Sequence, residues 1–241
     1  MIIAAARIAA LIMLLVVCVP IHIMTRLLFG WSDWPRRFLA AAAWICGARV
    51  RVTGKRLRPH TLLVCNHTSW LDIPVLGGAT GCAFVSKAEL GHPLVHWMAD
   101  QDGTLYIRRN DRRGSAGQAQ AIAEKLREPQ PLALFPEGTT GPGTEMLPFR
   151  STLFEAVAPT PPRVEVRPVA IDYGSASPEL GWHDEPGKEN VLRILGRGRT
   201  LPVTIRILDP LEPMSDRKAL AKAARDKIGA ALSSSPRHPR V

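Results

Sequence analysis

From residue 49 onward, short apolar segments alternate with longer amphipathic ones, and this alternation limits the chain to a small set of folds. Apolar runs of about four to eight residues are typical of strands, and the stretches between them are long enough for helices. The predicted strands are Val50–Thr53, Thr61–Cys65, Cys82–Ser86, Thr104–Ile107, Leu132–Phe135, Val164–Ile171 and Val203–Leu208. The predicted helices are Ser69–Gly77, Lys87–Ala99, Arg113–Arg127, Thr152–Ala158 and Ser215–Leu232. Together they predict an α/β fold with a mixed, largely parallel sheet flanked by helices.

Residues 1–47 have a different pattern, typical of a membrane-anchoring segment. Between Ile8 and Met24 the only strongly polar side chain is His22, and this run is close to the minimum of about 17 residues for a membrane-spanning helix. Pro20 is expected to break the helix near its end, because proline lacks the backbone N–H that the helix requires. A spanning helix, a kinked helix that dips into one leaflet and a signal peptide are all compatible with this run, although no small-x-small cleavage site follows it.

A second apolar piece, Phe38–Cys46, is too short to span a membrane. Trp31, Trp34 and two arginines precede it, and such residues favour the headgroup level of a bilayer. The two pieces predict a helical hairpin in the cytoplasmic leaflet of the inner membrane, and a helix of the protein core is the alternative for the second piece. We expect membrane-anchoring helices over 1–47, one folded domain over 48–233 and a disordered tail over 234–241.

The chain carries a formal net charge of +10, with 31 Lys and Arg against 21 Asp and Glu. This excess favours anionic partners such as a lipid surface, a phosphorylated substrate or an acidic carrier protein. Nucleic acid is not expected, because the basic residues are scattered and no nucleic-acid recognition pattern is present. The four cysteines lie in apolar runs without paired short spacing, so we expect small buried residues and no zinc or disulfide framework.

Three loops that follow predicted strands carry the polar residues of interest, and the first contains His67 and Asp72. In open α/β sheets, chemistry collects beyond the carboxyl ends of the strands. A His and an Asp five residues apart can meet if the chain turns between them. The carboxylate then holds one imidazole nitrogen, and the other nitrogen is free to accept a proton from a substrate hydroxyl. A core histidine with local hydrogen bonds is the structural alternative.

The other two loops add positive charge and glycine. Arg108, Arg109, Arg112 and Arg113 follow the strand Thr104–Ile107, and guanidinium groups match phosphate oxygens. Glu137 follows the predicted strand Leu132–Phe135. At the end of this strand its carboxylate can accept a hydrogen bond from a hydroxyl or pair with an arginine. Glycines at 138, 141 and 143 then allow backbone N–H groups to approach a ligand closely. A solvated turn is the structural alternative for each loop taken alone.

Three other classes of protein compete with a general-base enzyme. A zinc hydrolase could use His92 and His96 with His67 or Asp72, although no Glu lies between the first two in the usual position. A serine hydrolase is disfavoured, because the chain has no Gly-x-Ser-x-Gly elbow. The non-enzymatic alternative is a protein that binds anionic lipid through its arginines and uses His67 structurally.

Taken together, the loops resemble the glycerolipid acyltransferase family, specifically the 1-acylglycerol-3-phosphate acyltransferases, over about residues 45 to 210. The family's NHxSxxD block is matched by Asn66, His67, Ser69 and Asp72, and its FPEGT block by Phe135 to Thr139. Gly103 to Arg108 resembles the second block and Val166 to Ala170 the fourth, while Lys87 matches a common basic position. Phe149-Arg150-Ser151-Thr152 replaces the usual Phe-Lys-x-Gly, and Thr140 replaces an Arg of phosphatidate-forming members.

The resemblance implies transfer of a fatty acyl group from acyl-CoA or acyl carrier protein to the free hydroxyl of lysophosphatidic acid, giving phosphatidic acid. Enzymes that acylate lyso-ornithine lipid look similar at these positions, so that acceptor stays open. His67 and Asp72 are the expected catalytic residues. No metal or cofactor is expected, and the enzyme is expected at the cytoplasmic side of the inner membrane. The expected substrate-binding residues are Lys87, Arg108, Glu137, Gly138, Thr139 and Pro168.

Overall fold

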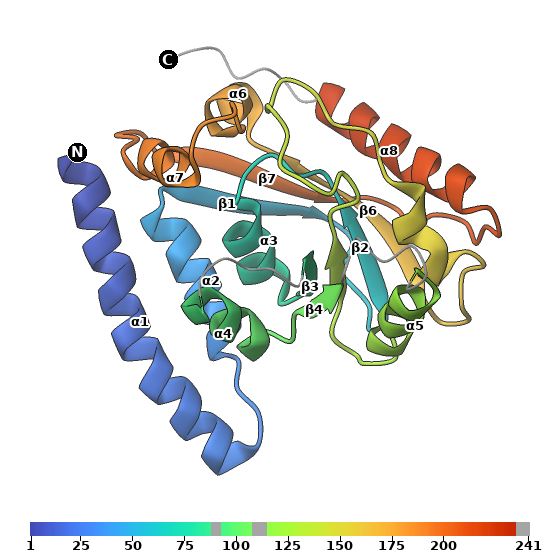
Figure 1. Ribbon diagram of the computed structural model, residues 1–241, viewed down its shortest axis with the longest axis horizontal. Coiled ribbons are helices and arrows are strands. Elements are labelled where there is room, and N and C mark those ends of the chain that lie inside the picture. Colours follow the sequence, from blue (N-terminus) through green and yellow to red (C-terminus); the bar gives the residue numbers. More distant parts are fainter. Residues whose placement is uncertain (88–92, 108–114, 235–241) are drawn as a thin grey trace.

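The computed structural model describes residues 1–87, 93–107 and 115–234, and it places one seven-stranded sheet between two sets of helices (Figure 1). The strand order is β1-β7-β6-β2-β5-β3-β4. Among these strands only β6 and β7 pair antiparallel, so the sheet is mixed and largely parallel, as the sequence predicts. The strands are β1 Ala48–Gly54, β2 Thr61–Cys65, β3 Ala83–Lys87, β4 Leu105–Ile107, β5 Leu132–Leu134, β6 Glu165–Asp172 and β7 Leu201–Ile207.

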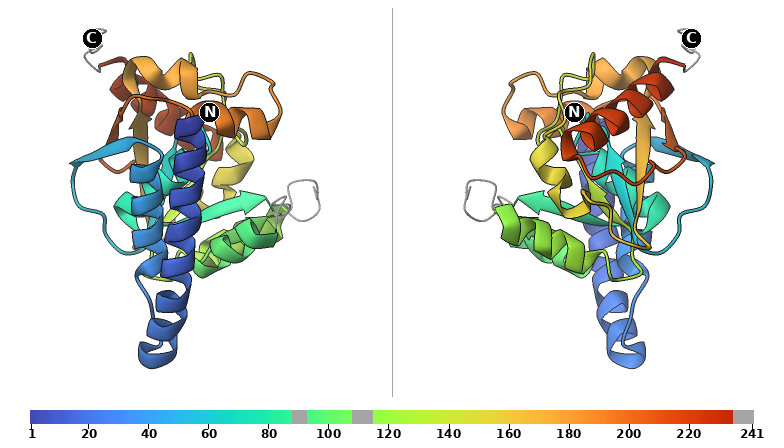
Figure 2. Two further views of the ribbon diagram at one scale, coloured as in Figure 1. Left: turned by 90° about the vertical axis from the view of Figure 1, so that its left-hand side faces the viewer. Right: turned by 90° about the vertical axis from the view of Figure 1, so that its right-hand side faces the viewer.

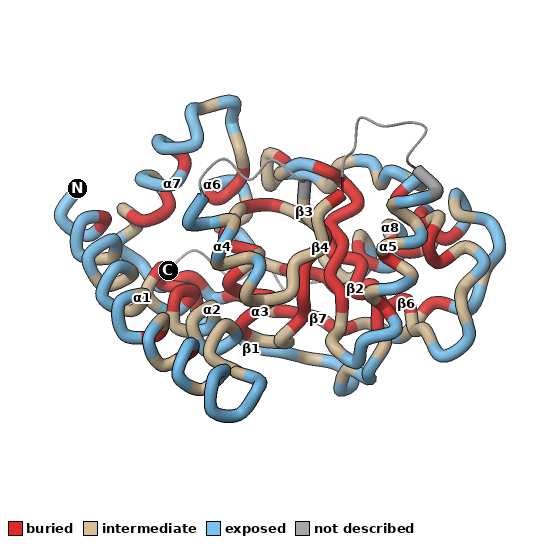
Figure 3. Tube along the Cα trace, turned by 60° about the horizontal axis from the view of Figure 1, so that its bottom comes forward, coloured by how far each residue is buried: buried red, intermediate tan, exposed pale blue. Residues whose placement is uncertain are grey.

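Strand β2 lies in the middle of the sheet and is buried along its whole length, which explains its uninterrupted apolar sequence. Its side chains alternate between the two faces. Leu63 and Cys65 join a core cluster with side chains of α2 (Trp34–Ile45), α3 (Asp72–Thr80) and α7 (Gly187–Leu195). Leu62 and Val64 join a second cluster with α5 (Ser115–Lys125), the 3₁₀ helix η1 (Ser151–Val157) and α8 (Arg217–Ser233). The buried side chains therefore form two clusters, one on each face of the sheet. Figure 3 shows the buried positions concentrated in the middle of the molecule, around the strands.

Several predicted helices differ from the observed ones. The helix predicted over Ser69–Gly77 begins at Asp72, because residues 68 and 69 donate their backbone N–H groups to the Asp72 carboxylate and form a turn. Lys87 belongs to β3 rather than to a helix, and α4 covers Pro93–Gln101. Thr152–Ala158 is a 3₁₀ helix rather than an α-helix. The short helices η2 (Gly174–Ala176) and α6 (Ser177–Leu180) and the helix α7 were not predicted from the sequence.

Helix α1 (Ile2–Phe29) continues through Pro20, contrary to the expected break. A proline removes one backbone hydrogen bond, and the helix continues on both sides of it. The 28-residue helix is long and apolar enough to cross a membrane, and an 18-residue window within it has a mean hydropathy of 2.8. Gly30 ends the helix in the left-handed conformation, and α2 returns alongside α1. Figure 2 shows the tip of this hairpin projecting beyond the rest of the molecule.

The hairpin is also attached to the sheet domain. Ala4, Cys18 and His22 of α1 are buried, and the Arg7 guanidinium donates a hydrogen bond to the carbonyl of Leu195 in α7. Helix α2 buries Ala42 and Ala43 and packs on α3. The segment Phe38–Cys46 is therefore part of a hairpin and, through its inner face, part of the core.

Candidate active site

Five parallel strands of the sheet end at the same edge, and the polar residues of the site follow these ends. His67 lies two residues after β2, Phe135 directly after β5, and Tyr173 directly after β6. The adjacency of β5, β2 and β6 therefore brings together three loops that are far apart in the sequence.

The centre of the site is a hydrogen bond of 2.8 Å between His67 Nδ1 and Asp72 Oδ2. The His67 ring stacks on the Phe135 ring, with 4.1 Å between their centroids, and this contact fixes its plane. Only 16% of the His67 side chain is exposed. In the portion of the chain that the structure describes, Nε2 has no hydrogen-bond partner, so this nitrogen is available to accept a proton from a hydroxyl.

Asp72 is fully buried at the first turn of α3. Its Oδ2 atom accepts the backbone N–H groups of Thr68 and Ser69 at 2.8 and 2.9 Å in addition to His67. The Tyr173 hydroxyl donates to the other oxygen, Oδ1, at 2.5 Å. These four donors and the helix N-terminus stabilise a negative charge that would otherwise be costly to bury.

Asn66 sets the position of the His67 loop relative to β6. Its side-chain amide donates to the carbonyl of Ile171 at 3.0 Å and accepts the Ile171 N–H at 2.8 Å. This pair extends the β2–β6 ladder one step beyond the last backbone pairing, Cys65 with Val169. His67 is consequently the first residue released from the sheet.

Glu137 lies beneath the His67 loop and is only 4% exposed. Its Oε1 accepts the His67 backbone N–H at 2.7 Å, and its Oε2 accepts the Leu147 N–H at 2.8 Å. Burial raises the pKa of Glu137 to about 7, although both backbone donors act in the opposite direction. The Gly141 N–H donates to the His67 carbonyl at 3.0 Å, so the loop after β5 holds both backbone polar groups of His67.

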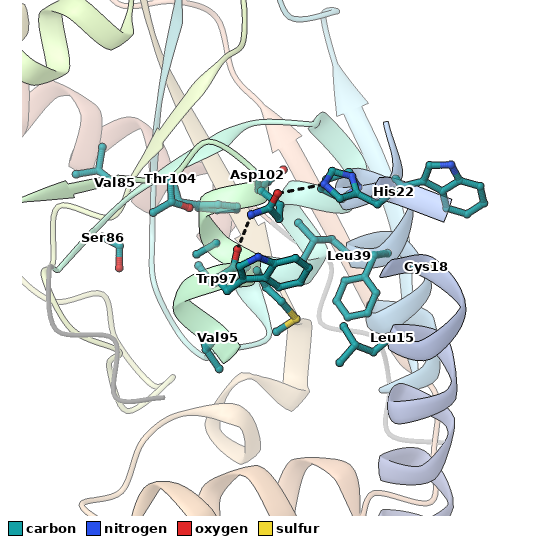
Figure 4. A pocket seen from close by; sticks show the side chains of 18 of the residues that line it. Leu15, Cys18, His22, Leu39, Val85, Ser86, Val95, Trp97, Asp102 and Thr104 are labelled. Carbon is teal, nitrogen blue, oxygen red and sulfur yellow. Dashed lines mark hydrogen bonds between the residues drawn. The ribbon is translucent and has the colours of Figure 1, made fainter. Parts of the chain in front are cut away.

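A largely apolar cavity of about 420 Å³ opens beside His67. Its lining comes from α1, α2, α4, β3 and the loops that follow β2 and β5. Figure 4 shows Leu15 and Cys18 of α1 on one side of the cavity, and Val85 and Ser86 of β3 on the other. A long aliphatic chain fits such a lining, because apolar side chains surround it and keep water out.

One polar network interrupts the apolar lining. His22 of α1 shares hydrogen bonds with Ser32 Oγ at 2.9 Å and Gln101 Oε1 at 3.2 Å, and Gln101 also donates to the Trp97 carbonyl (Figure 4). His22 thus joins the α1–α2 hairpin to the end of α4 through hydrogen bonds.

Comparison with known proteins agrees with this geometry. The acyltransferase family model matches residues 49–172, which include most of β1, the His67 loop, the Glu137 loop and all of β6. The chain belongs to the acyltransferase family.

Two relatives and one solved structure illustrate the similarity. The lyso-ornithine lipid O-acyltransferase of Pseudomonas aeruginosa is 36% identical over 83% of this chain and 76% of its own length. A 1-acyl-sn-glycerol-3-phosphate acyltransferase of Neisseria gonorrhoeae is 33% identical over 53% of this chain and 46% of its own. The crystal structure of the 1-acyl-sn-glycerophosphate acyltransferase PlsC from Thermotoga maritima shares the fold, with a TM-score of 0.59, 24% identity and coverage of 83% and 77% of the two chains. The chain is therefore an acyltransferase of the lysophospholipid type.

The acyltransferase site contains some of the predicted substrate-binding residues. Gly138 and Thr139 line the cavity together with His67. Lys87 ends β3 beside Ile107 of β4, and its side chain is outside the described part of the structure. Arg108 follows Ile107 and also lies outside the described residues, as do Arg109, Arg112 and Arg113.

Glu137 and Pro168 are not among the residues that line this cavity. Glu137 uses both carboxylate oxygens for backbone N–H groups. Pro168 is buried in the sheet, pairs with Val64, and accepts the Leu208 N–H through its carbonyl. Both residues therefore contact the protein backbone: Glu137 accepts hydrogen bonds from backbone N–H groups, and Pro168 takes part in the sheet.

The structure describes the four cysteines and part of the alternative zinc-ligand set. All four cysteines are free and buried, as the sequence predicts. His92 lies outside the described residues, and His96 pairs with Asp100 at 3.3 Å and stacks on Tyr106. Across 1–87, 93–107 and 115–234, no group of three or more His, Cys, Asp or Glu residues is arranged to hold a metal ion.

Sequence reasoning missed one member of the acyltransferase site, Tyr173. The available signal was its position directly after a predicted strand, where polar side chains of an α/β site collect. The role of Asn66 as a bridge to β6 was also missed, because the sequence does not say which strand lies beside β2.

Proposed function

We propose that this enzyme transfers a fatty acyl group from an acyl thioester to the free hydroxyl of a lysolipid, with lyso-ornithine lipid as the acceptor. The observation that carries the proposal is the His67–Asp72 hydrogen bond at the mouth of an apolar cavity. This arrangement supplies a base for a hydroxyl and a dry pocket for an aliphatic chain.

His67 Nε2 removes the proton from the acceptor hydroxyl as its oxygen attacks the thioester carbonyl. Asp72 holds the imidazole tautomer and stabilises the imidazolium that forms. The tetrahedral intermediate then collapses, the carbon–sulfur bond breaks, and the thiolate takes the proton from His67. Base assistance of this kind typically contributes about 10²–10⁴-fold to the rate. Backbone N–H groups of the loop containing Gly138 are the candidates for stabilising the oxyanion.

The choice of acceptor rests on the relatives and on one residue. The lyso-ornithine lipid acyltransferase of P. aeruginosa aligns with most of this chain, whereas the N. gonorrhoeae enzyme aligns with about half of it. Thr140 occupies a position where phosphatidate-forming members usually carry an Arg. Lysophosphatidic acid, the acceptor that the motifs alone favour, remains the second candidate.

Lys87 and Arg108 bind the anionic group of the acceptor in this proposal, and Gly138 and Thr139 form the adjoining wall. Glu137 contributes by holding the His67 backbone, and Pro168 lies beside Val64 in the strand that leads to His67. The donor is acyl-CoA or acyl carrier protein, both polyanionic, and the net charge of +10 favours either one. In this proposal the α1–α2 hairpin anchors the enzyme at the cytoplasmic face of the inner membrane, where the lysolipid acceptor resides.

Thiol release from acyl-CoA and from acyl carrier protein tests the proposal, with lyso-ornithine lipid or lysophosphatidic acid as the acceptor. We expect release that depends on lyso-ornithine lipid and disappears in His67→Ala and Asp72→Ala, with both variants still folded. Release that depends only on lysophosphatidic acid would keep the mechanism and change the acceptor. Turnover close to normal in His67→Ala would overturn the assignment of the base. No thiol release with any combination of donor and acceptor would favour a lipid-binding protein.

A further inference from the structure

Tyr173 is a buried hydroxyl in direct contact with the proposed catalytic pair. It stands directly after β6, and its oxygen lies 2.5 Å from Asp72 Oδ1. The exposed fractions of Tyr173 and Asp72 are 3% and 0%. Burial raises the pKa of Tyr173 well above its usual range, so the hydroxyl keeps its proton and remains a donor.

The two oxygens of Asp72 have different partners. Oδ2 faces His67 and the N–H groups of residues 68 and 69, and Oδ1 faces Tyr173. A carboxylate held from both sides cannot rotate away from the imidazole. The Tyr173 hydroxyl also draws negative charge toward Oδ1, because a hydrogen bond to an ionised acceptor is strong. Less charge is then left on the oxygen that faces His67.

We infer that Tyr173 is a positioning residue that sets the base strength of His67 through Asp72. This inference rests on the proposed role of His67 as the base. With the hydroxyl removed, more charge stays on Oδ2 and the imidazole holds a proton more tightly. His67 would then become available as a base only at higher pH.

Within residues 1–87, 93–107 and 115–234, two other titratable groups interact with the pair. Glu137, in the loop after β5, accepts a hydrogen bond from the His67 backbone N–H. Cys65, at the end of β2, interacts electrostatically with Asp72. Burial, together with the charge of Asp72, raises the pKa of the Cys65 thiol, so this group stays neutral. Both residues are unchanged in a Tyr173 variant, so the difference between two pH profiles isolates the hydroxyl.

The first experiment compares the pH profiles of kcat/KM for the full-length wild-type enzyme and Tyr173→Phe. We expect the acid limb to move to higher pH by about half a unit and kcat to fall by roughly 10-fold, with little change in the acceptor KM. Tyr106→Phe is the matched control, because Tyr106 is the other tyrosine of the chain and donates to the His96 carbonyl instead. An unchanged profile with kcat within twofold of the wild type would overturn the inference.

A second experiment keeps the hydroxyl and strengthens it as a donor. In a Tyr106→Phe background, biosynthetic incorporation of 3-fluorotyrosine labels Tyr173 alone, because the chain has two tyrosines. Fluorine makes a phenol more acidic, so the acid limb is expected to move to lower pH, opposite to Tyr173→Phe. Movement in the same direction as Tyr173→Phe, or none, would overturn the inference.

The fluorine also gives a readout that does not require turnover. The ¹⁹F resonance of labelled Tyr173 is expected to shift as His67 titrates and to lose this shift in His67→Ala. A resonance that titrates identically in both proteins would overturn the coupling. Activity that survives in His67→Ala would instead overturn the proposed function, so the two failures are distinguishable.

Discussion

Asn66 and Ile171 exchange two hydrogen bonds, and these bonds hold the His67 loop against β6. A side-chain amide here replaces a backbone peptide at the point where β2 leaves the sheet. The same short segment of β6 leads directly into Tyr173, so the bridge sets the distance between that residue and the His67 loop.

Asn66→Ala is expected to lower turnover by at least 10-fold, because His67 loses its register against Phe135 and Asp72. Leaving the Ile171 N–H and carbonyl unpaired in a buried site should cost about 1–3 kcal/mol of stability. Urea unfolding and acyl-transfer kinetics measure the two effects. Asn190→Ala is the matched control, since Asn190 is equally buried but lies in α7 and binds Gly181 and Glu185. Similar turnover in both variants would contradict a specific role for Asn66.

Glu137 is expected to make stability fall as pH rises toward 7. Its pKa is about 7 in the folded protein against 4.5 for an ordinary Glu. Between these values the folded state binds more protons than the unfolded state, so the free energy of unfolding decreases with pH by up to about 1.4 kcal/mol per unit. Glu137→Gln should reduce this slope and leave the part that comes from Asp102, whose pKa burial also raises to about 7. The exposed Glu145→Gln should retain the full slope, as measured by urea unfolding in detergent from pH 5 to 8. Equal slopes in all three proteins would refute the burial effect.

The contact between α2 and α3 depends on the absence of a side chain at Gly78. A Cβ atom there would lie 2.5 Å from the Ala40 backbone, so Gly78→Ala should separate the two helices and lower the melting temperature. Gly117→Ala in α5 places its Cβ in open space and should stabilise the protein by about 0.5–1 kcal/mol. A neutral or stabilising Gly78→Ala would show that α2 is not held closely against the domain.

The tip of the hairpin carries exposed apolar side chains, including Leu27 and Phe29 at 81% and 67% exposure. Glutamate at both positions should reduce the fraction of protein that floats with anionic vesicles, because charge opposes insertion into the bilayer. Val52→Glu on edge strand β1 is the control for an added acidic residue at an exposed apolar site. Equal flotation of all variants would place the membrane contact elsewhere.

Arg108→Ala is expected mainly to raise the acceptor KM, since a guanidinium that binds an anionic group contributes equally to the ground state and the transition state. Steady-state kinetics with varied acceptor concentration measure this effect. An unchanged KM would move the anion-binding role to Arg109 or Arg112.

Much of the fold followed from local patterns in the sequence. The uninterrupted apolar residues of β2 predict a central strand, because only a strand covered on both faces has no polar side. His67 and Asp72 lie within one turn of the same loop, so their contact needs no knowledge of the rest of the chain. Gly138 was expected near the site because it follows a predicted strand, and Thr139 was expected there because Phe135 to Thr139 resembles the family's FPEGT block.

Other features required the three-dimensional arrangement. Tyr173 meets Asp72 across 101 positions of sequence and Glu137 meets His67 across 70, because β6 and β5 are the neighbours of β2. Strand order is set by how helices cover both faces of the whole sheet, and local periodicity does not encode it. The continuity of α1 through Pro20 is another example, since packing against α2 and the domain outweighs one missing hydrogen bond. The sequence alone thus determined the fold class and the contact between His67 and Asp72, whereas the tertiary structure decided which distant groups hold that pair and form the cavity beside it.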